Sequence, residues 1–199
     1  KLLILKMHRC TGFTRLSLGL QSVVPHVLKV LERTHTPSRG LDAARWAAAE
    51  GFDHVSLDLI YGTPGESLDD WRSSLDAVLE TPVDHVSAYA LIVEEGTRLG
   101  MQVRRGEVAM PDDDDLADKY LVADDLLSGL GYANYEVSNW ARPGGQCRHN
   151  LAYWRGNDWW GIGPGAHSHI GGVRFWNRKH PRSYAASLAE GSSPALARE

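Results

Sequence analysis

The sequence lacks the features that mark disulfide-stabilised, membrane-spanning or nucleic-acid-binding proteins. It has two cysteines, Cys10 and Cys147, which are too few for a disulfide framework or a metal site built from cysteines alone. No apolar run approaches the ~20 residues that span a bilayer, and no signal-peptide pattern follows the start. Acidic residues (25) outnumber basic ones (21), with no basic stripe, which excludes a nucleic-acid footprint. We therefore expect a cytoplasmic protein without a nucleic-acid partner or an integral membrane segment.

The composition that is present is typical of a globular protein with one domain, or one and a half. The chain has 199 residues, of which 43% are hydrophobic and 23% are charged, which is enough to bury a core. Residues 1–10, KLLILKMHRC, show no clean helical or strand period. We expect them to be an atypical leader or a truncation junction, and a disordered leader is the alternative.

The first half of the chain alternates predicted strands with predicted helices. Three segments have the apolar pattern of strands bounded by turns: 15–22, 53–62 and 84–93. Helices are predicted between them: 23–35, 39–52 and 67–80. Ser67 is the expected N-cap of the last helix, with Asp69 and Asp70 in its first turn. This alternation indicates βαβ units, a parallel sheet and the α/β fold class.

The pattern changes near residues 94–111, where we place the boundary between the α/β part and the remainder. A helix predicted over 111–132 begins with an acidic run that suits the helix dipole. Its consecutive carboxylates diverge around the helix, which argues against a metal site. Three further elements are predicted: a short strand at 132–141, a strand flanked by glycine turns at 161–172, and a surface helix at 180–191.

Polar residues follow the predicted strands, where ligands of parallel sheets bind. Gln21 ends the first strand, and Asp58 lies late in the second, on the same face as Ser56 and Ile60. Asp58 is either a ligand-binding carboxylate or a structural one bonded to the backbone of a neighbouring loop. Arg33 either pairs with a carboxylate ligand or is a solvated cation at a helix end. The turn YGTPGES, before a helix N-terminus, is a weak indication of an anion site.

Six segments occur in the order and spacing of one family: RLSLGLQS, ERTH, DLIYGTPGES, VSAYALIVEEGT, YEVSNWARPG and CRHNLAYWRGNDWWGIGPGAHS. Over residues 11–190 the chain resembles the radical S-adenosylmethionine (SAM) proteins of the oxygen-independent coproporphyrinogen III oxidase group. HNLAYW matches the HNxxYW signature of the haem-chaperone branch of that group. The resemblance implies that residues 11–95 are the later part of an incomplete (β/α) radical SAM barrel. Residues 96–199 would then be the smaller α+β C-terminal region of that branch.

The resemblance also implies a SAM site. Gln21, Arg33 and Asp58 match positions that bind SAM in the family, and Ala90 matches a backbone contact. The chemistry of these side chains agrees, because an arginine pairs with the methionyl carboxylate and an aspartate accepts hydrogen bonds from ribose hydroxyls. Gln21 offers both a donor and an acceptor.

The second cofactor of the family, a [4Fe–4S] cluster, has no motif in this sequence. The CxxxCxxC loop that holds the cluster and the Gly-rich SAM-binding strand after it do not occur among the 199 residues. Cys10 lies in HRCTG and Cys147 in QCRHN, whereas such a cluster needs at least three thiolates. These 199 residues are therefore not expected to bind the cluster or to perform radical chemistry.

Residues 148–172 combine aromatic rings, imidazoles and glycines, which suits a porphyrin. Aromatic faces and closely approaching backbone match a flat apolar ring, arginines match its propionates, and a histidine is a common axial ligand of haem iron. The candidate side chains are Arg148 and Arg155 for propionates and His149, His167 or His169 for iron. His149 leads, with Arg148 beside it, because it opens the HNxxYW signature.

Packing is the alternative role for this segment, and it is the one we favour for most of its tryptophans. The rings that would join the second region to the barrel are Trp140, Trp154, Trp159 and Trp160. Asn150 and Tyr153 would support the loop's own shape. The glycines would serve either a porphyrin or an approach of this segment to SAM.

Two functions follow from the resemblance. One is a haem chaperone that binds haem and delivers it to acceptor proteins. The other is an oxygen-independent coproporphyrinogen III oxidase, which decarboxylates propionates of that porphyrinogen through a 5′-deoxyadenosyl radical. The HNxxYW signature favours the chaperone. A third interpretation is that this polypeptide alone is an inert fragment.

Overall fold

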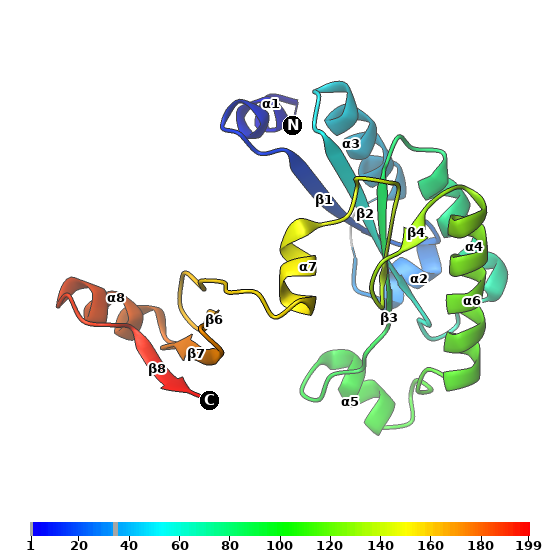
Figure 1. Cartoon of the computed structure of the whole chain (residues 1–199). Coiled ribbons are helices and arrows are strands. Elements are labelled where there is room, and N and C mark those ends of the chain that lie inside the picture. Colours follow the sequence, from blue (N-terminus) through cyan, green and yellow to red (C-terminus); the bar gives the residue numbers. More distant parts are fainter. Residues whose placement is uncertain (1, 34–35) are drawn as a thin grey trace. The chain divides into compact units, whose positions relative to one another are not determined.

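The computed structural model describes residues 2–33 and 36–199 (Figure 1). The chain forms two compact units, Lys1–Gln146 and Cys147–Glu199. This division differs from the boundary near residues 94–111, because the segment between that boundary and Gln146 packs on the parallel sheet of the first unit. The limits expected for the barrel part (11–95) and the C-terminal region (96–199) are not tested by this division and stay a prediction. Thr34 and His35, in the helix predicted over 23–35, lie outside the described residues.

The first unit contains a five-stranded sheet in the order β1-β2-β3-β5-β4. Its strands are β1 (Arg15–Gln21), β2 (His54–Tyr61), β3 (His85–Ala90), β4 (Ala133–Asn134) and β5 (Asn139–Ala141). The first three strands are parallel, as predicted, whereas β5 runs antiparallel to β3 and β4 antiparallel to β5. Among the described strands β1 pairs with β2 alone, so it lies at an edge of the sheet.

Six helices of the first unit lie within the described residues: α1 (Leu2–Cys10), α2 (Pro25–Val30), α3 (Pro37–Ala49), α4 (Leu68–Leu79), α5 (Arg98–Arg104) and α6 (Asp113–Gly129). Helix α4 begins as predicted, with a capping box in which Ser67 Oγ accepts from Asp70 N–H and the Asp70 carboxylate accepts from Ser67 N–H. The C-cap glycine predicted for α3, Gly51, has a φ of 80°.

The first residues form a helix, which the sequence did not indicate. Helix α1 is tied to the turn before β2, because Arg9 Nε donates to Gly51 O at 2.7 Å and Arg9 Nη2 to Asp53 Oδ1 at 3.1 Å. Residues without a clean helical period therefore still form a helix, while their place as a leader or a junction stays a prediction. The hydrophobic periodicity of residues 1–10 cannot predict a contact between residues that are 42 positions apart in the sequence.

Helices α3, α4 and α6 cover one face of the sheet (Figure 1). The two central strands turn alternate residues into this core, and the helices add large side chains. Trp71 of α4 is fully buried, and its indole N–H donates to Lys119 O of α6 at 2.8 Å. The core includes Leu20, Val55, Leu57, Leu59, Leu75, Val86, Ala88, Leu127 and Trp140.

The other face of the sheet is polar, because strand residues alternate in direction. Asp58 and Ser56 lie on it together, as predicted, between apolar residues that face the helices. In the register of β2 with β3, Ser56 pairs with His85 and Asp58 with Ser87. Candidate ligand-binding groups are therefore concentrated on this face.

Residues 132–141 form two strands and not the single strand predicted. Strands β4 and β5 make a hairpin, and Tyr135 N–H donates to Asn139 O at 3.1 Å across its loop. The loop carries Glu136, whose carboxylate accepts from Ser138 N–H at 2.9 Å and from the Asn139 side chain. These local bonds to Glu136 turn the chain back on itself.

The second unit consists of two helices and a three-stranded antiparallel sheet in the order β6-β7-β8. Its elements are α7 (Arg148–Trp154), β6 (His167–Ile170), β7 (Val173–Asn177), α8 (Pro181–Ala189) and β8 (Ala195–Arg198). The strand and the closing helix predicted here are confirmed. The HNxxYW signature was interpreted as a loop, but it forms helix α7.

Candidate functional site

Asp58 lies on the polar face of the sheet and is held by two serines. Ser17 Oγ of β1 donates to the Asp58 carboxylate, 2.8 and 2.9 Å from its two oxygens, and Ser56 Oγ lies 3.3 Å from Oδ1. Among the described residues, the donors to Asp58 are thus hydroxyls of the sheet rather than backbone N–H groups of a neighbouring loop. A carboxylate has about four acceptor positions, so Asp58 can still accept from a ligand hydroxyl.

A chain of hydrogen bonds continues from Asp58 to the hairpin loop. Ser56 Oγ lies 2.8 Å from His85 Nδ1, and His85 Nε2 lies 2.8 Å from Tyr135 Oη. Because Ser56 donates to Asp58, His85 Nδ1–H donates to Ser56 and Nε2 accepts from the tyrosine. Burial, followed by the charge of Arg15, lowers the pKa of His85 to about 4. The imidazole is therefore neutral at pH 7, as this series of hydrogen bonds requires.

Gln21 reaches the same face through an unusual backbone conformation. Its φ is 68°, in the left-handed region, at an irregularity in the pairing of β1 with β2. The side chain folds back over Gly19, where an added Cβ would lie 2.6 Å from Gln21 Nε2. Since Gly19 is the register partner of Asp58, Gln21 and Asp58 lie on neighbouring strands of one polar surface.

Arg33 lies in the turn after α2, because the helix ends before Leu31. The residue before it, Glu32, has a φ of 53°, and with Gln21 it is the second non-glycine residue at positive φ in the described chain. Such conformations are costly and are frequent at functional sites. Arg33 lines a cavity of 240 Å³ together with Ile60 and Leu91. These two residues follow Asp58 and Ala90 at the carboxyl ends of β2 and β3.

Ala90 is partly buried at the end of β3, paired with Tyr61 of β2. All four residues of the predicted SAM site thus lie at or near the carboxyl ends of the parallel strands. The structure links Gln21 to Asp58 by strand register, and it places Arg33 in a cavity that reaches this edge. Their roles in SAM binding stay a prediction. The sequence reasoning missed Ser17 and His85 and placed Ser56 only by its face, although serines alternating with apolar residues in LSLGL and VSLDL were a usable signal.

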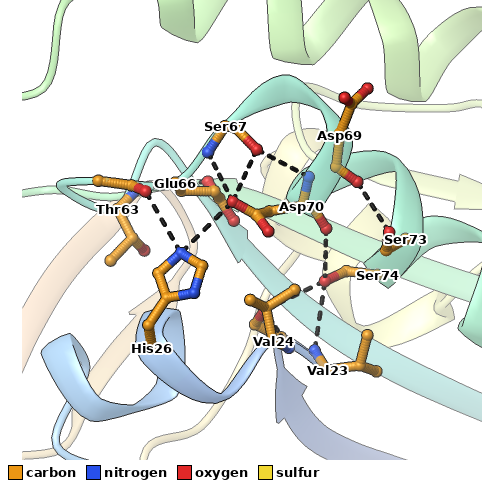
Figure 2. A network of polar contacts seen from close by, with 12 residues as sticks. Val23, Val24, His26, Thr63, Glu66, Ser67, Asp69, Asp70, Ser73 and Ser74 are labelled. Atoms are coloured by element: carbon orange, nitrogen blue, oxygen red, sulfur yellow. Dashed lines mark hydrogen bonds and ion pairs between the residues drawn. The ribbon is translucent and has the colours of Figure 1, made fainter.

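The turn between β2 and α4 already holds a carboxylate of its own. Glu66 Oε2 accepts from Gly62 N–H at 2.7 Å and from Thr63 N–H at 3.3 Å. Burial, the largest cause, raises the pKa of Glu66 to about 7. The turn YGTPGES, which indicated an anion site, thus already binds a carboxylate of the chain itself, that of Glu66. Figure 2 shows the other side of this turn, where His26 Nε2 lies 3.4 Å from an oxygen of Asp70 in the first turn of α4.

In the second unit the signature residues begin a series of ring contacts. His149 packs edge-on against Tyr153 with centroids 4.8 Å apart, and Tyr153 packs edge-on against Trp159 at 4.6 Å. Trp159 in turn stacks on His169 at 4.8 Å. Arg148 and His149 are both exposed on α7. His149 is therefore accessible beside an aromatic surface.

The other two candidate histidines differ in their surroundings. His169 Nδ1 lies 3.2 Å from Asn157 O, and the ring is partly buried against Trp159. His167 is exposed and stacks on Trp176 with centroids 5.5 Å apart. His169 is thus tied to its loop, whereas His149 is exposed on α7.

Packing explains only part of the tryptophan content. Trp140 is fully buried in the first unit, where its indole N–H donates to Asp124 Oδ1 at 2.8 Å. Trp159 is partly buried between Tyr153 and His169. Trp154 and Trp160, in contrast, are 58% and 67% exposed. Trp140 and Trp159 thus pack within their own units, whereas Trp154 and Trp160 present apolar surface to solvent. A role of these rings in joining the two regions stays a prediction.

The described residues do not fit an iron–sulfur cluster. Cys10 is exposed on α1 and Cys147 is partly buried in the other compact unit. Residues 2–33 and 36–199 contain no group of three or more His, Cys, Asp or Glu side chains placed to hold a metal ion. Two thiolates are fewer than a [4Fe–4S] cluster needs. In the same residues, no helix has the length and apolar character needed to cross a bilayer.

Comparison with known proteins agrees with this geometry. The family model of the radical SAM superfamily matches residues 3–78, including most of the segment that we expected to be a leader. The structure of the coproporphyrinogen III oxidase HemN from Escherichia coli, described as a radical SAM enzyme, superposes on the whole chain with a TM-score of 0.83. At 22% identity, over 48% of HemN, this match shows the fold alone. The chain is a mixed α/β radical SAM protein whose parallel sheet corresponds to part of a barrel.

Curated relatives show which group of radical SAM proteins the chain is similar to. The chain is 61% identical over 186 residues to the heme chaperone HemW of Mycobacterium tuberculosis H37Rv, covering 94% of the chain and 48% of that protein. It is 36% identical to HemW of Lactococcus lactis over 87% of the chain and 46% of that protein. The chain is a partial HemW-like protein, and it spans about half the length of these relatives.

Proposed function

We propose that the chain is the SAM-binding and haem-binding part of a HemW-type haem chaperone that delivers haem to acceptor proteins. The observation that carries the proposal is the 61% identity to a protein named heme chaperone HemW over 94% of the chain. The structure supports it with an exposed Arg148–His149 pair at the start of the signature helix. The proposed location is the cytoplasm, on the basis of composition alone.

The polar edge of the sheet has the chemistry to hold SAM. Arg33 would pair with the methionyl carboxylate, Asp58 would accept from ribose hydroxyls, and Gln21 would bond to the same ligand from the neighbouring strand. Ala90 would offer its backbone at the end of β3. When bound beside a reduced [4Fe–4S] cluster, SAM supplies a 5′-deoxyadenosyl radical. The role proposed for these residues is to bind and orient SAM.

The second unit would take haem. His149 lies on an exposed helix face next to Tyr153, and a neutral imidazole is a common axial ligand of haem iron. Arg148, adjacent in sequence and also exposed, would pair with a propionate. The exposed Trp154 supplies an aromatic face on the same helix. The oxidase stays the alternative from the sequence, and no observation on this chain favours it over the chaperone.

Titration of the chain with haemin tests the proposal. We expect a Soret shift that saturates at a defined ratio, and transfer of the bound haem to an apo-haemoprotein. His149→Ala is expected to weaken binding and change the spectrum while the melting temperature is unchanged, because His149 is exposed. His167→Ala tests the other exposed candidate of the same unit, and normal haemin binding by this variant would assign the iron ligand to His149 rather than His167. A normal spectrum for His149→Ala together with a lowered melting temperature would show that His149 supports the fold instead.

A further inference from the structure

The three-stranded sheet of the second unit (Figure 1) has one apolar side that lies open to solvent. A groove of 660 Å³ lies on this side. The residues that line it come from all three strands and from the segment before β6: Trp160, Ile170, Val173, Phe175, Leu196 and Arg198, with two alanines of β8. We call this set of residues the apolar face.

Strand register places the side chains of the apolar face together. Val173 and Phe175 alternate along β7, and a strand turns alternate residues to the same side. Their register partners are Ile170 of β6 and Arg198 of β8, which therefore share that side. Trp160 packs edge-on against Phe175 with ring centroids 5.9 Å apart. The apolar face is thus one continuous surface that crosses the whole sheet.

The apolar face is incompletely covered. Trp160 is 67% exposed, Leu196 is 54% exposed and Val173 is 39% exposed. A sheet buries its apolar side against a second layer of helices or strands, and a contiguous exposed apolar patch marks an interaction surface. The second unit does not supply that layer itself, so the layer comes from another part of the polypeptide or from another molecule.

Arg198 adds a positive charge to the apolar face. Within the described residues it is the one ionisable side chain that lines the groove, and it is exposed. The neighbouring carboxylate of Glu199 pairs with Arg174, at 3.2 Å, rather than with Arg198. An arginine presented beside an apolar surface pairs well with a carboxylate of the partner. The matching occupant has an apolar stripe with an acidic residue at its margin, which is the pattern of an amphipathic helix.

The relatives contain enough additional chain to supply such a helix. The chain covers 48% of HemW from Mycobacterium tuberculosis and 46% of HemW from Lactococcus lactis. About half of a HemW-type polypeptide therefore lies outside the residues that match this chain. A segment of the same polypeptide has a high effective concentration at the apolar face, which favours it over a separate molecule of equal affinity.

We infer that the apolar face is the docking surface of an amphipathic helix from the part of the HemW-type polypeptide outside these 199 residues, with an acidic residue of that helix opposite Arg198. The inference concerns neither SAM nor haem. The candidate iron ligands His167 and His169 alternate with Ile170 along β6, so they lie on the opposite side of the sheet.

Leu196→Asp, made both in this chain and in the full-length protein, tests the inference. In the 199-residue chain the melting temperature should change by no more than about 2 °C, because Leu196 is exposed there. In the full-length protein it should fall by about 5 °C or more, because the introduced carboxylate is buried under the docked helix. Leu188→Asp, at an exposed leucine of α8 outside the groove, is the matched control and should leave both melting temperatures unchanged.

Cross-linking identifies the occupant without destabilising the fold. A carbodiimide joins an amine to a carboxylate that contacts it, so Arg198→Lys in the full-length protein converts the cation into a reactive one while keeping its charge. We expect mass spectrometry to find residue 198 joined to an aspartate or glutamate outside these 199 residues. Arg182→Lys, on α8 and outside the groove, should not form that cross-link.

Each other result overturns the inference. Equal losses of melting temperature in the two proteins would show that Leu196 packs within this chain, and no loss in either would show that the apolar face stays uncovered. A cross-link between two copies would assign the surface to a dimer, and cross-links confined to these 199 residues would exclude an outside helix. None of these measurements involves haem, so a failure of haemin binding would refute the proposed function and leave this inference standing.

Discussion

The amide group of Gln21 lies directly over the α-carbon of Gly19, where an added Cβ would be 2.6 Å from Gln21 Nε2. Glycine at this position therefore gives Gln21 the space to fold back onto the face that carries Asp58, the register partner of Gly19. The backbone at Gln21, with its φ of 68°, directs the side chain there. The three residues form one unit at the end of β1.

Gly19→Ala is expected to weaken SAM binding without unfolding the chain. The added methyl displaces the flexible end of Gln21 rather than any backbone, so the melting temperature should change little. The dissociation constant for SAM, measured by calorimetry, should rise by about five- to tenfold, the value of one lost hydrogen bond to a charged or polar ligand group. Gly129→Ala, where a Cβ meets nothing within 4 Å, is the control. Unchanged SAM affinity in Gly19→Ala would show that Gln21 does not contact SAM.

Glu66 should make the chain less stable as the pH rises. The pKa of Glu66 is raised from 4.5 to about 7, so the folded chain binds the proton more tightly than the unfolded chain. Its contribution to the free energy of unfolding is fully present below pH 4.5 and is lost as the pH rises through 7. Glu66→Gln keeps an oxygen acceptor for Gly62 N–H and removes this loss. Relative to the unchanged chain, the free energy of unfolding of Glu66→Gln should therefore be higher at pH 8 than at pH 5, by an amount on the order of 2 kcal/mol. Urea titrations at the two pH values measure this difference.

Glu66→Ala is the control for that experiment. It leaves Gly62 and Thr63 without their acceptor, so it should destabilise the chain at every pH. If Glu66→Gln follows the same pH dependence as the unchanged chain, the carboxyl group is ionised in the folded state and the assigned pKa is wrong.

His85 acts in the opposite direction over nearly the same range of pH. Its pKa is lowered from 6.5 to about 4, so the folded chain binds this proton less tightly than the unfolded chain. Its contribution is present above pH 6.5 and is lost as the pH falls through 4. His85→Asn preserves a donor to Ser56 but loses Tyr135, so it should be less stable at pH 7 and show a flatter profile between pH 6.5 and 4.5. His167→Asn, at an exposed site, should leave the profile unchanged, and an unaltered profile in His85→Asn would refute the assignment.

Lys119 is fully buried on α6, and its ammonium group pairs with Asp115 one turn earlier. Asp115→Ala leaves this buried charge unpaired and should lower the free energy of unfolding by about 2 kcal/mol, less than for a fully buried pair because Asp115 is half exposed. Lys119→Met, which replaces the cation with an apolar chain of similar length, should cost less than about 1 kcal/mol. Asp114→Ala, in the same helical turn, is the control. An equal cost for Asp115→Ala and Lys119→Met in urea titrations at pH 7 would contradict this account.

The amino-acid pattern alone predicted the α/β class, the three parallel strands and the start of α4. These features depend on local chemistry. Alternation in residues 54–61 assigns side chains to two faces, and Ser67 with Asp70 closes a capping box within four residues. The family motifs likewise identified Gln21, Arg33 and Asp58 as site candidates, since each motif is a short continuous segment.

The contacts of those residues depend on the packing of elements that are distant in sequence. Ser17 and Asp58 are 41 residues apart, and His85 and Tyr135 are 50 residues apart, so their hydrogen bonds depend on strand register and on the return of a hairpin. The burial of Lys119 and the helix formed by residues 2–10 also depend on neighbours that are distant in sequence. Local patterns fix which face a side chain occupies, because backbone geometry repeats along an element. Which groups meet on that face is decided by packing between elements, and packing gives no periodic signal in the sequence.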